Sequence, residues 1–361
     1  MAPLLGALGW MATPFRGDDA DLRYRVRGKG GERARLHHKF DIGFTFGDLD
    51  RVEVAPDGRH GSFAADALKP IVLVFGRQGQ VARALAASGA PFEFVFAGRE
   101  RLDLAREDAD IAGLVVSERP AAVINASAYN AVDAAETDLV GCNRLNRDAP
   151  AAMAAACARA DTPFVHFSTD YVFDGAKGLP YVEVDQRSPI NAYGRSKADG
   201  EAALEAQIDA GARAATIRTC WVFAPGGSGF MSAMVRAAAD GRDVSVVADQ
   251  WGTPTPADAC ADAALRLTVA LLDRDAAAIG TFHAAGRDGV SRADFAEAIM
   301  ARAPAPTGVR RVSTDEYPTP AKRPRDTRLS SAKLEAGFGW RAPALAEALD
   351  RCLSGLEAQP R

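Results

Sequence analysis

From Pro70 onward the chain alternates short apolar runs with stretches long enough to form helices. The apolar runs are IVLVF, FEFVFAG, AAVINASA, PFVHFSTD and AATIRT, at residues 71–75, 92–98, 121–128, 163–170 and 214–219. Runs of this length predict buried strands, and right-handed helical crossovers between them place helices on both faces of a parallel sheet. The pattern therefore predicts an α/β fold, a Rossmann-type doubly wound parallel sheet.

Two alanine-rich stretches, residues 149–160 and 198–210, have the composition of crossover helices. Pro163 and Gly211 follow them and mark their ends. After Thr219 the strand pattern loosens, and Pro- and Gly-rich pieces such as APGGSGF and WGTPTPADA alternate with helical stretches. We therefore expect one sheet domain over residues 70–220. Residues 221–361 are expected to form mainly a smaller C-terminal lobe, with some segments returning to the sheet.

The first 69 residues do not share this pattern. They hold the basic stretch RYRVRGKGGERARLHHKF and three of the five histidines. A boundary is expected at Lys69–Pro70, with an N-terminal extension before it. The sequence leaves open whether residues 1–69 are a partly ordered extension, a remnant of another domain or the product of an upstream start codon.

Composition and charge narrow the partners. Hydrophobic residues make up 48% of the chain and charged residues 25%, and the formal net charge of −4 gives no reason to expect nucleic acid as a partner. No apolar run approaches the roughly 20 residues of a membrane span. The five cysteines form no C-x-x-C pair, which favours reduced thiols and a cytoplasmic location.

A glycine turn joins the first strand to the first helix, in the sequence GRQGQVA at residues 76–82. Gly76 permits the tight turn, Gly79 lets the backbone approach a pyrophosphate, and Ala82 lets the helix pack on the strand. The helix N-terminus then faces the anion. This arrangement predicts a dinucleotide cofactor.

The end of the second strand bears on which nicotinamide cofactor binds. It reads Ala97-Gly98-Arg99, where a guanidinium can meet a 2′-phosphate, so NADPH is favoured and NADH is the alternative. A solvated loop charge is the other reading of Arg99. Asp103 and Leu104 are expected to border the adenine, and the small residues at 126–128 allow the backbone to pass close to the dinucleotide.

Tyr193 and Lys197 lie four residues apart, a spacing that puts both on one face of a helix. An ammonium beside a phenol stabilises the phenolate and is expected to lower the pKa of Tyr193. The fourth strand ends in Ser168-Thr169-Asp170, which brings hydroxyls to the carboxyl edge of the sheet to polarise a carbonyl. Asp170 is read either as an acceptor for a sugar hydroxyl or as an Asx-turn residue.

Other chemistries find no support in the sequence. His166 lies within an apolar strand and His283 follows Thr281-Phe282, so neither belongs to a cluster with metal-ligand spacing. Neither the G-x-S-x-G motif of hydrolases nor the Walker lysine motif occurs. A reductase is therefore favoured over a hydrolase, a kinase or a zinc enzyme.

The blocks GRQGQVA, NASAYNAVDAAE, FSTDYVFDG, SPINAYGRSKADGE, RTCWVF and DQWGTPT together resemble the dTDP-4-dehydrorhamnose reductase family of extended short-chain dehydrogenases, from about residue 71 to the C-terminus. The resemblance implies NADPH- or NADH-dependent reduction of the C4 keto group of dTDP-4-dehydro-L-rhamnose, with a dTDP-sugar as substrate. It implies a catalytic set of Thr169, Tyr193 and Lys197. It also implies the following binding residues: Gly79, Gln80, Val81, Asp103, Leu104, Ala128, Tyr129 and Asn130 for the cofactor, and Thr169, Asp170 and Trp221 for the substrate.

Some features depart from the family or leave alternatives open. Certain members dimerise through Mg²⁺ held by glutamates, one of them in the first helix, but residues 81–88 contain no carboxylate. A bridging metal is therefore not expected, and the chain is expected to be a monomer or a homodimer. Lys322, Arg323 and Arg325 are read either as neutralising a nucleotide diphosphate or as a solvated basic loop. The alternative functions are another nucleotide-sugar reductase or epimerase, and a non-catalytic NADP-binding regulatory subunit.

Overall fold

The computed structural model describes residues 69–226, 229–303 and 307–354, and the backbone of six short strands between residues 11 and 63. The chain divides into two compact units. The first contains residues 1–72 and 91–93, and the second contains residues 73–90 and 94–361.

The N-terminal strands form two small antiparallel sheets. One contains β1 (Met11–Arg16), β2 (Leu22–Arg27) and β3 (Arg33–His37), and the other contains β4 (Phe44–Thr45), β5 (Val52–Val54) and β6 (Gly61–Phe63). The hydrophobic pattern predicted no strands in this segment. The sequence suggested that residues 1–69 form a partly ordered extension. Most of these residues lie outside the part of the chain that the structure describes.

The main sheet has six strands in the order β16-β11-β10-β9-β7-β8. Their bounds are β7 (Ile71–Phe75), β8 (Glu93–Ala97), β9 (Ala122–Asn125), β10 (Phe164–Thr169), β11 (Ala214–Thr219) and β16 (Gly280–His283). β9, β10, β11 and β16 pair in parallel. The predicted Rossmann-type fold is confirmed, and β16 is a sixth strand that no predicted run contained.

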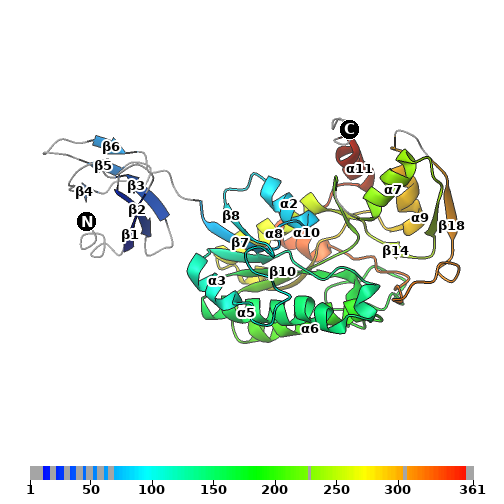
Figure 1. The fold of residues 1–361 in the computed structure, drawn as a ribbon, viewed down its shortest axis with the longest axis horizontal. Coiled ribbons are helices and arrows are strands. Elements are labelled where there is room, and N and C mark those ends of the chain that lie inside the picture. The colour runs from blue at the N-terminus through cyan, green and yellow to red at the C-terminus, as the bar shows by residue number, and fades with distance from the viewer. Residues whose placement is uncertain are drawn as a thin grey trace. The chain divides into compact units, whose positions relative to one another are not determined.

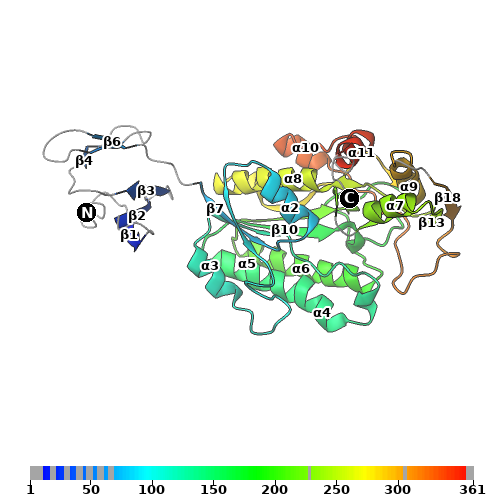
Figure 2. The ribbon, with the colours of Figure 1, turned by 45° about the horizontal axis from the view of Figure 1, so that its top comes forward.

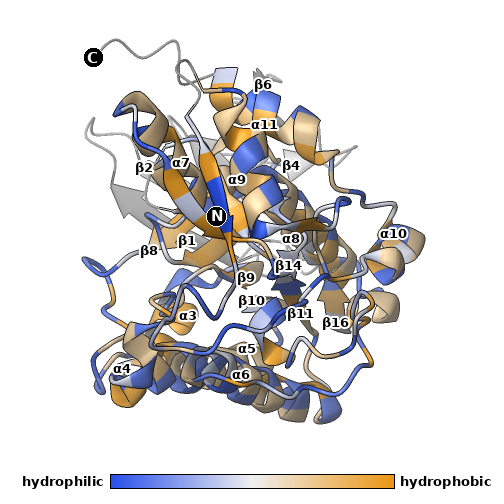
Figure 3. Cartoon of the chain, turned by 90° about the vertical axis from the view of Figure 1, so that its right-hand side faces the viewer, coloured by the Kyte–Doolittle hydropathy of each residue, from blue (hydrophilic) through white to orange (hydrophobic). Residues whose placement is uncertain are grey.

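Helices cover both faces of this sheet (Figures 1 and 2). α2 (Gln80–Ala87) and α8 (Ala257–Leu272) lie on one face, and α3 (Ile111–Glu118), α5 (Ala149–Arg159) and α6 (Ala192–Asp209) lie on the other. α6 mixes hydrophobic and hydrophilic positions (Figure 3), as expected of a helix that buries one side. α6 begins at Ala192, before the alanine-rich stretch, because the Asn191 side chain caps it by accepting a hydrogen bond from Gly194 N at 2.7 Å.

The central strands are buried along their whole length. Every residue of β9, β10 and β11 is buried, as are four of the five residues in β7. Strands covered on both faces need continuous apolar runs, which explains why they stood out in the sequence. The described helices include none both long and apolar enough to span a membrane.

The C-terminal lobe has a core of its own. α7 (Phe230–Ala239), α9 (Arg292–Met300) and α11 (Leu345–Ser354) pack with β13 (Val244–Val247) around buried residues such as Met231, Phe295 and Leu349. β13 pairs in parallel with β18 (Val309–Val312). Shorter elements complete the lobe: β12 (Val222–Phe223) pairs with β15 (Thr255–Pro256), and β14 (Trp251–Gly252) pairs with β17 (Val290–Ser291). α10 (Ala332–Phe338) packs against β16 of the main sheet. α8 and β16, within 257–283, belong to the main sheet and its helices.

Candidate active site

A pocket of about 660 Å³ opens where the main-sheet strands end. Many of the lining residues lie at the ends of β7, β9, β10 and β11 or just after them. Others belong to α6 and to the start of the lobe. The lining residues are Gln78, Gly79, Gln80, Val81, Arg83, Ala126, Ser127, Ala128, Asn130, Phe167, Ser168, Thr169, Asp170, Tyr193, Lys197, Thr219, Trp221, Val222 and Gly229. The strand order reverses between β7 and β9, so the pocket lies where doubly wound sheets bind ligands.

The glycine turn forms one wall of the pocket. Gly76 has φ +101°, and a Cβ there would lie 3.0 Å from Ala126 O, so only glycine fits this turn readily. Gly79 precedes α2, whose first turn has no side-chain cap and no acidic residue. The first N–H groups of α2 are thus left to a ligand, and they are suited to an anion. Gly79, Gln80 and Val81, which the resemblance assigns to the cofactor, line the pocket.

The turn after β9 forms a second wall. Asn125 is fully buried, and its Oδ1 accepts hydrogen bonds from Ser127 N at 3.0 Å and Ser127 Oγ at 2.6 Å. Ala128 and Asn130 line the pocket. Tyr129 does not, although its backbone is held from both sides by the Asn146 side chain at 2.9 and 3.0 Å.

With Tyr129, five predicted cofactor residues lie outside the pocket lining. Leu104 is buried in the core of the sheet domain, and Asp103 accepts a hydrogen bond from Ala105 N at 3.1 Å. Arg99 is exposed, and its side chain makes no hydrogen bond or ion pair with the described residues. Gly76 also does not line the pocket, but it shapes the turn that does.

Tyr193 and Lys197 project from the first turns of α6 and both line the pocket. The Lys197 ammonium is buried and donates a hydrogen bond to Phe167 O at 2.5 Å. Burial lowers the pKa of Lys197 to about 8, and the nearby Glu201 carboxylate acts in the opposite direction. At neutral pH the side chain therefore remains largely protonated.

The Tyr193 phenol differs from the sequence expectation. Burial raises the pKa of Tyr193, and a hydrogen bond with Thr169 lowers it only in part. The Lys197 ammonium donates its hydrogen bond to the Phe167 carbonyl instead of to the phenol. The phenol is consequently neutral at physiological pH and holds a proton that it can donate.

Thr169 and Asp170 form a buried polar group beside Tyr193. Thr169 Oγ1 donates to Asp170 Oδ1 at 2.9 Å and accepts from Tyr171 N at 3.2 Å. Asp170 Oδ2 accepts from Cys220 Sγ at 3.1 Å and from Thr327 Oγ1 at 2.5 Å. Burial raises the pKa of Asp170, while these hydrogen bonds lower it. The side chain that bonds the backbone of this turn is Thr169, so Asp170 is not an Asx-turn residue. The Asp170 carboxylate instead binds the side chains of Thr169, Cys220 and Thr327.

Trp221 lines the pocket from the start of the lobe. Its φ of +46° lies in the left-handed region, which bulky residues rarely adopt. A Cβ on Gly252 would lie 2.5 Å from Trp221 Cε2, so this glycine leaves room for the indole. The Arg292 guanidinium covers a face of the ring, with Cζ 3.5 Å from the ring centroid.

Sequence reasoning missed several lining residues and Arg292. Phe167 and Thr219 are strand residues whose place at the carboxyl edge follows once the strand ends are known. The sequence gave no sign that Arg83, Val222 and Gly229 line the pocket. They come together only because the start of the lobe lies next to α2. Among the described residues, no group of three or more His, Cys, Asp or Glu side chains is placed to hold a metal ion.

Comparisons with known proteins agree with this geometry. The family model described as RmlD substrate binding domain matches residues 70–358. A dTDP-4-dehydrorhamnose reductase from Burkholderia thailandensis is 40% identical over 303 residues, which cover 80% of this chain and 99% of that protein.

Two crystal structures are similar over the same part of the chain. A dTDP-4-dehydrorhamnose reductase from Clostridium acetobutylicum has a TM-score of 0.73 at 29% identity and covers 80% of this chain and 99% of its own. One from Bacillus anthracis, in complex with NADP, has a TM-score of 0.73 at 28% identity and covers 80% of this chain and all of its own. The family match leaves residues 1–69 outside it. From residue 70 onward, the chain belongs to the dTDP-4-dehydrorhamnose reductase family.

Proposed function

We propose that this protein uses NADPH to reduce the C4 keto group of dTDP-4-dehydro-L-rhamnose, giving dTDP-L-rhamnose. The observation that carries this proposal is that Thr169, Tyr193 and Lys197 line the same pocket as the glycine turn. Family membership supports the choice of substrate, since relatives 33–40% identical to this chain are named dTDP-4-dehydrorhamnose reductases.

The residues present fit a nicotinamide dinucleotide. The uncapped, acid-free first turn of α2 suits a pyrophosphate held by Gly79, Gln80 and Val81. When bound, the cofactor supplies a hydride. The preference for NADPH rests on Arg99, whose guanidinium is exposed, has no ion-pair partner among the described residues and is available to a 2′-phosphate. The rest of the proposed cofactor set is Gly76, Asp103, Leu104, Ala128, Tyr129, Asn130, Tyr193 and Lys197.

Tyr193 is the proposed proton donor to the C4 oxygen. Its raised pKa keeps the phenol protonated at neutral pH until an alkoxide develops beside it. The Thr169 hydroxyl contacts Tyr193. It is proposed to turn its one hydrogen from Asp170 to the C4 oxygen when substrate binds, which polarises the carbonyl. Lys197 supplies a positive charge in the same pocket as Thr169 and Tyr193, and it is proposed to bind the nicotinamide ribose.

The sugar nucleotide is proposed to contact Thr169, Asp170 and Trp221, all of which line the pocket. Asp170 also fixes Thr169 through their 2.9 Å hydrogen bond. The five cysteines are unpaired thiols, which supports the reducing cytoplasm as the location. The protein is proposed to act as a monomer or homodimer, without nucleic acid or membrane as a partner.

A coupled assay tests this function. Purified protein should oxidise NADPH when supplied with dTDP-4-dehydro-L-rhamnose, and much more slowly with keto sugars on other nucleotides. Preference for a different keto sugar would reassign the substrate. Binding of NADPH without oxidation, whichever keto sugar is supplied, would identify a non-catalytic protein instead.

A further inference from the structure

Among the described residues, Arg292 has no ion-pair partner, and it lies beside the pocket. It is the first residue of α9, and its guanidinium lies over the rings of Trp221 and Phe230, with Cζ 3.5 and 5.0 Å from the two centroids. Across the described part of the chain, this guanidinium forms no hydrogen bond and no ion pair. Its five N–H donors are therefore available to a ligand.

A small recess lined by Arg292 lies next to the main pocket. The recess is also lined by Gln80, Trp221, Val222 and Gly229, and the same four residues line the large pocket. Arg292 also acts electrostatically on Asp170, whose pKa it lowers. A ligand that contacts Trp221 from the large pocket thus comes within reach of the guanidinium.

Two other basic residues that the sequence suggested as diphosphate ligands already have carboxylate partners. Arg323 pairs with Asp133 at 2.9 Å, and Arg325 lies 3.4 Å from Asp249 and 3.6 Å from Asp315. Arg83 belongs to α2, beside the glycine turn, and donates to Gly226 O at 3.2 Å. These contacts weaken the sequence-based reading of Arg323 and Arg325 as diphosphate ligands, and they leave Arg292 as the better candidate.

We infer that Arg292 recognises the diphosphate of the sugar nucleotide and so sets the requirement for a nucleoside diphosphate, an inference that rests on the proposed function. A guanidinium presents a planar fork that matches phosphate oxygens in two parallel hydrogen bonds. The stacked Trp221 and Phe230 rings hold that fork in one orientation, which reduces the entropy lost on binding. Burial disfavours an uncompensated charge, and a bound anion offsets this cost.

Binding of dTDP and of thymidine to the full-length protein, with NADP⁺ present, tests the inference. Arg292→Gln should raise the Kd for dTDP on the order of 10- to 100-fold, the value of charge-assisted hydrogen bonds, and leave the Kd for thymidine within about twofold. Arg292→Lys keeps the charge but loses the fork, so its loss for dTDP should be smaller. Inorganic pyrophosphate should compete with dTDP in the native protein and much less in Arg292→Gln.

Arg310→Gln is the matched control, because Arg310 is an exposed arginine of the same lobe that contacts Ser245 outside the pocket. It should bind both ligands as the native protein does. Equal losses for dTDP and thymidine in Arg292→Gln would show that Arg292 only supports Trp221, and would overturn the inference. So would an unchanged Kd for dTDP. The proposed function fails separately, if the native protein does not oxidise NADPH with the keto sugar.

Discussion

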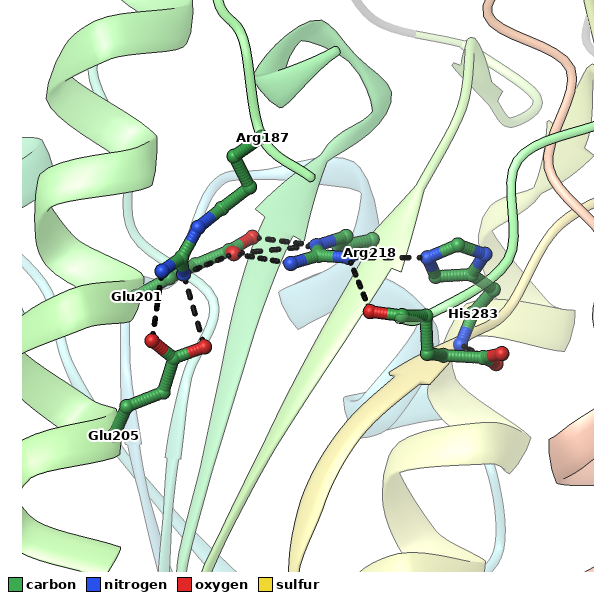
Figure 4. Close-up of polar contacts among 6 residues, drawn as sticks. Arg187, Glu201, Glu205, Arg218 and His283 are labelled. Carbon is green, nitrogen blue, oxygen red and sulfur yellow. Dashed lines mark hydrogen bonds and ion pairs between the residues drawn. The ribbon is translucent and has the colours of Figure 1, made fainter. Parts of the chain in front are cut away.

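The buried ion pair between Glu201 and Arg218 makes a strong prediction about stability (Figure 4). Arg218 on β11 exposes 3% of its side chain and Glu201 on α6 exposes none. Arg218 Nε and Nη2 donate to Glu201 at 3.0 and 2.7 Å, and Arg187 Nη1 adds a third contact at 3.0 Å. The pair ties α6, one turn after Lys197, to the strand beneath it.

Glu201→Gln should destabilise the second unit by about 3–5 kcal/mol, because it leaves the Arg218 guanidinium buried without a counter-charge. Glu205→Gln is the matched control. It is the same chemical change on the same helix, and Glu205 also pairs with Arg187, at 2.7 Å. However, 42% of the Glu205 side chain is exposed, so losing this pair should cost only about 0–1 kcal/mol.

Urea unfolding followed by tryptophan fluorescence measures this difference, since Trp221, Trp251 and Trp340 all lie in the second unit. With an m value of about 3 kcal/mol per M, the midpoint should fall by about 1 M or more for Glu201→Gln and by less than about 0.3 M for Glu205→Gln. The double variant Glu201→Leu with Arg218→Met should recover much of the loss, because it removes both charges. Equal shifts for Glu201→Gln and Glu205→Gln would refute the reasoning.

Two pH dependences follow from two buried basic residues, Lys197 and His283. The pH dependence of kcat/KM for NADPH reports groups of the free enzyme. This kcat/KM should fall as pH rises through about 8, because Lys197 then loses its proton. A profile that stays flat up to about pH 9 would contradict this. Burial lowers the pKa of His283 to about 3 from 6.5, so its neutral form stabilises the fold above pH 6.5 and this stability is lost as pH falls toward 3. Between pH 7 and pH 5 the free energy of unfolding should fall by about 2 kcal/mol because of His283. In His283→Gln the fall over the same pH range should be smaller by about 2 kcal/mol.

The sequence was most informative where burial was most complete. Four strands of the main sheet, β7, β9, β10 and β11, stood out because both of their faces are covered, which requires unbroken apolar runs. β16 at Gly280–His283 did not stand out, because this short strand contains Gly280, Thr281 and a buried His283. Strand ends placed Thr169 correctly at the pocket, since parallel strands bring their carboxyl ends to one edge.

What the sequence could not show depends on contacts between distant segments. Asp170 and Thr327 are far apart in the chain, and their hydrogen bond exists only because the C-terminal segment returns to the pocket. Arg292 resembles any arginine at the start of a helix until Trp221 is placed beneath it. The direction of the Tyr193 pKa shift also required the fold, because it depends on burial that no local pattern reports.

The central claim is that Tyr193 donates the proton in a reduction of a sugar nucleotide. The most direct measurement is NADPH oxidation with dTDP-4-dehydro-L-rhamnose by the native protein and by Tyr193→Phe, together with the Kd of each for NADPH. The account predicts turnover by the native protein and a loss of about 10²- to 10⁴-fold in kcat for the variant, with the Kd nearly unchanged. Equal turnover by the two proteins would contradict it.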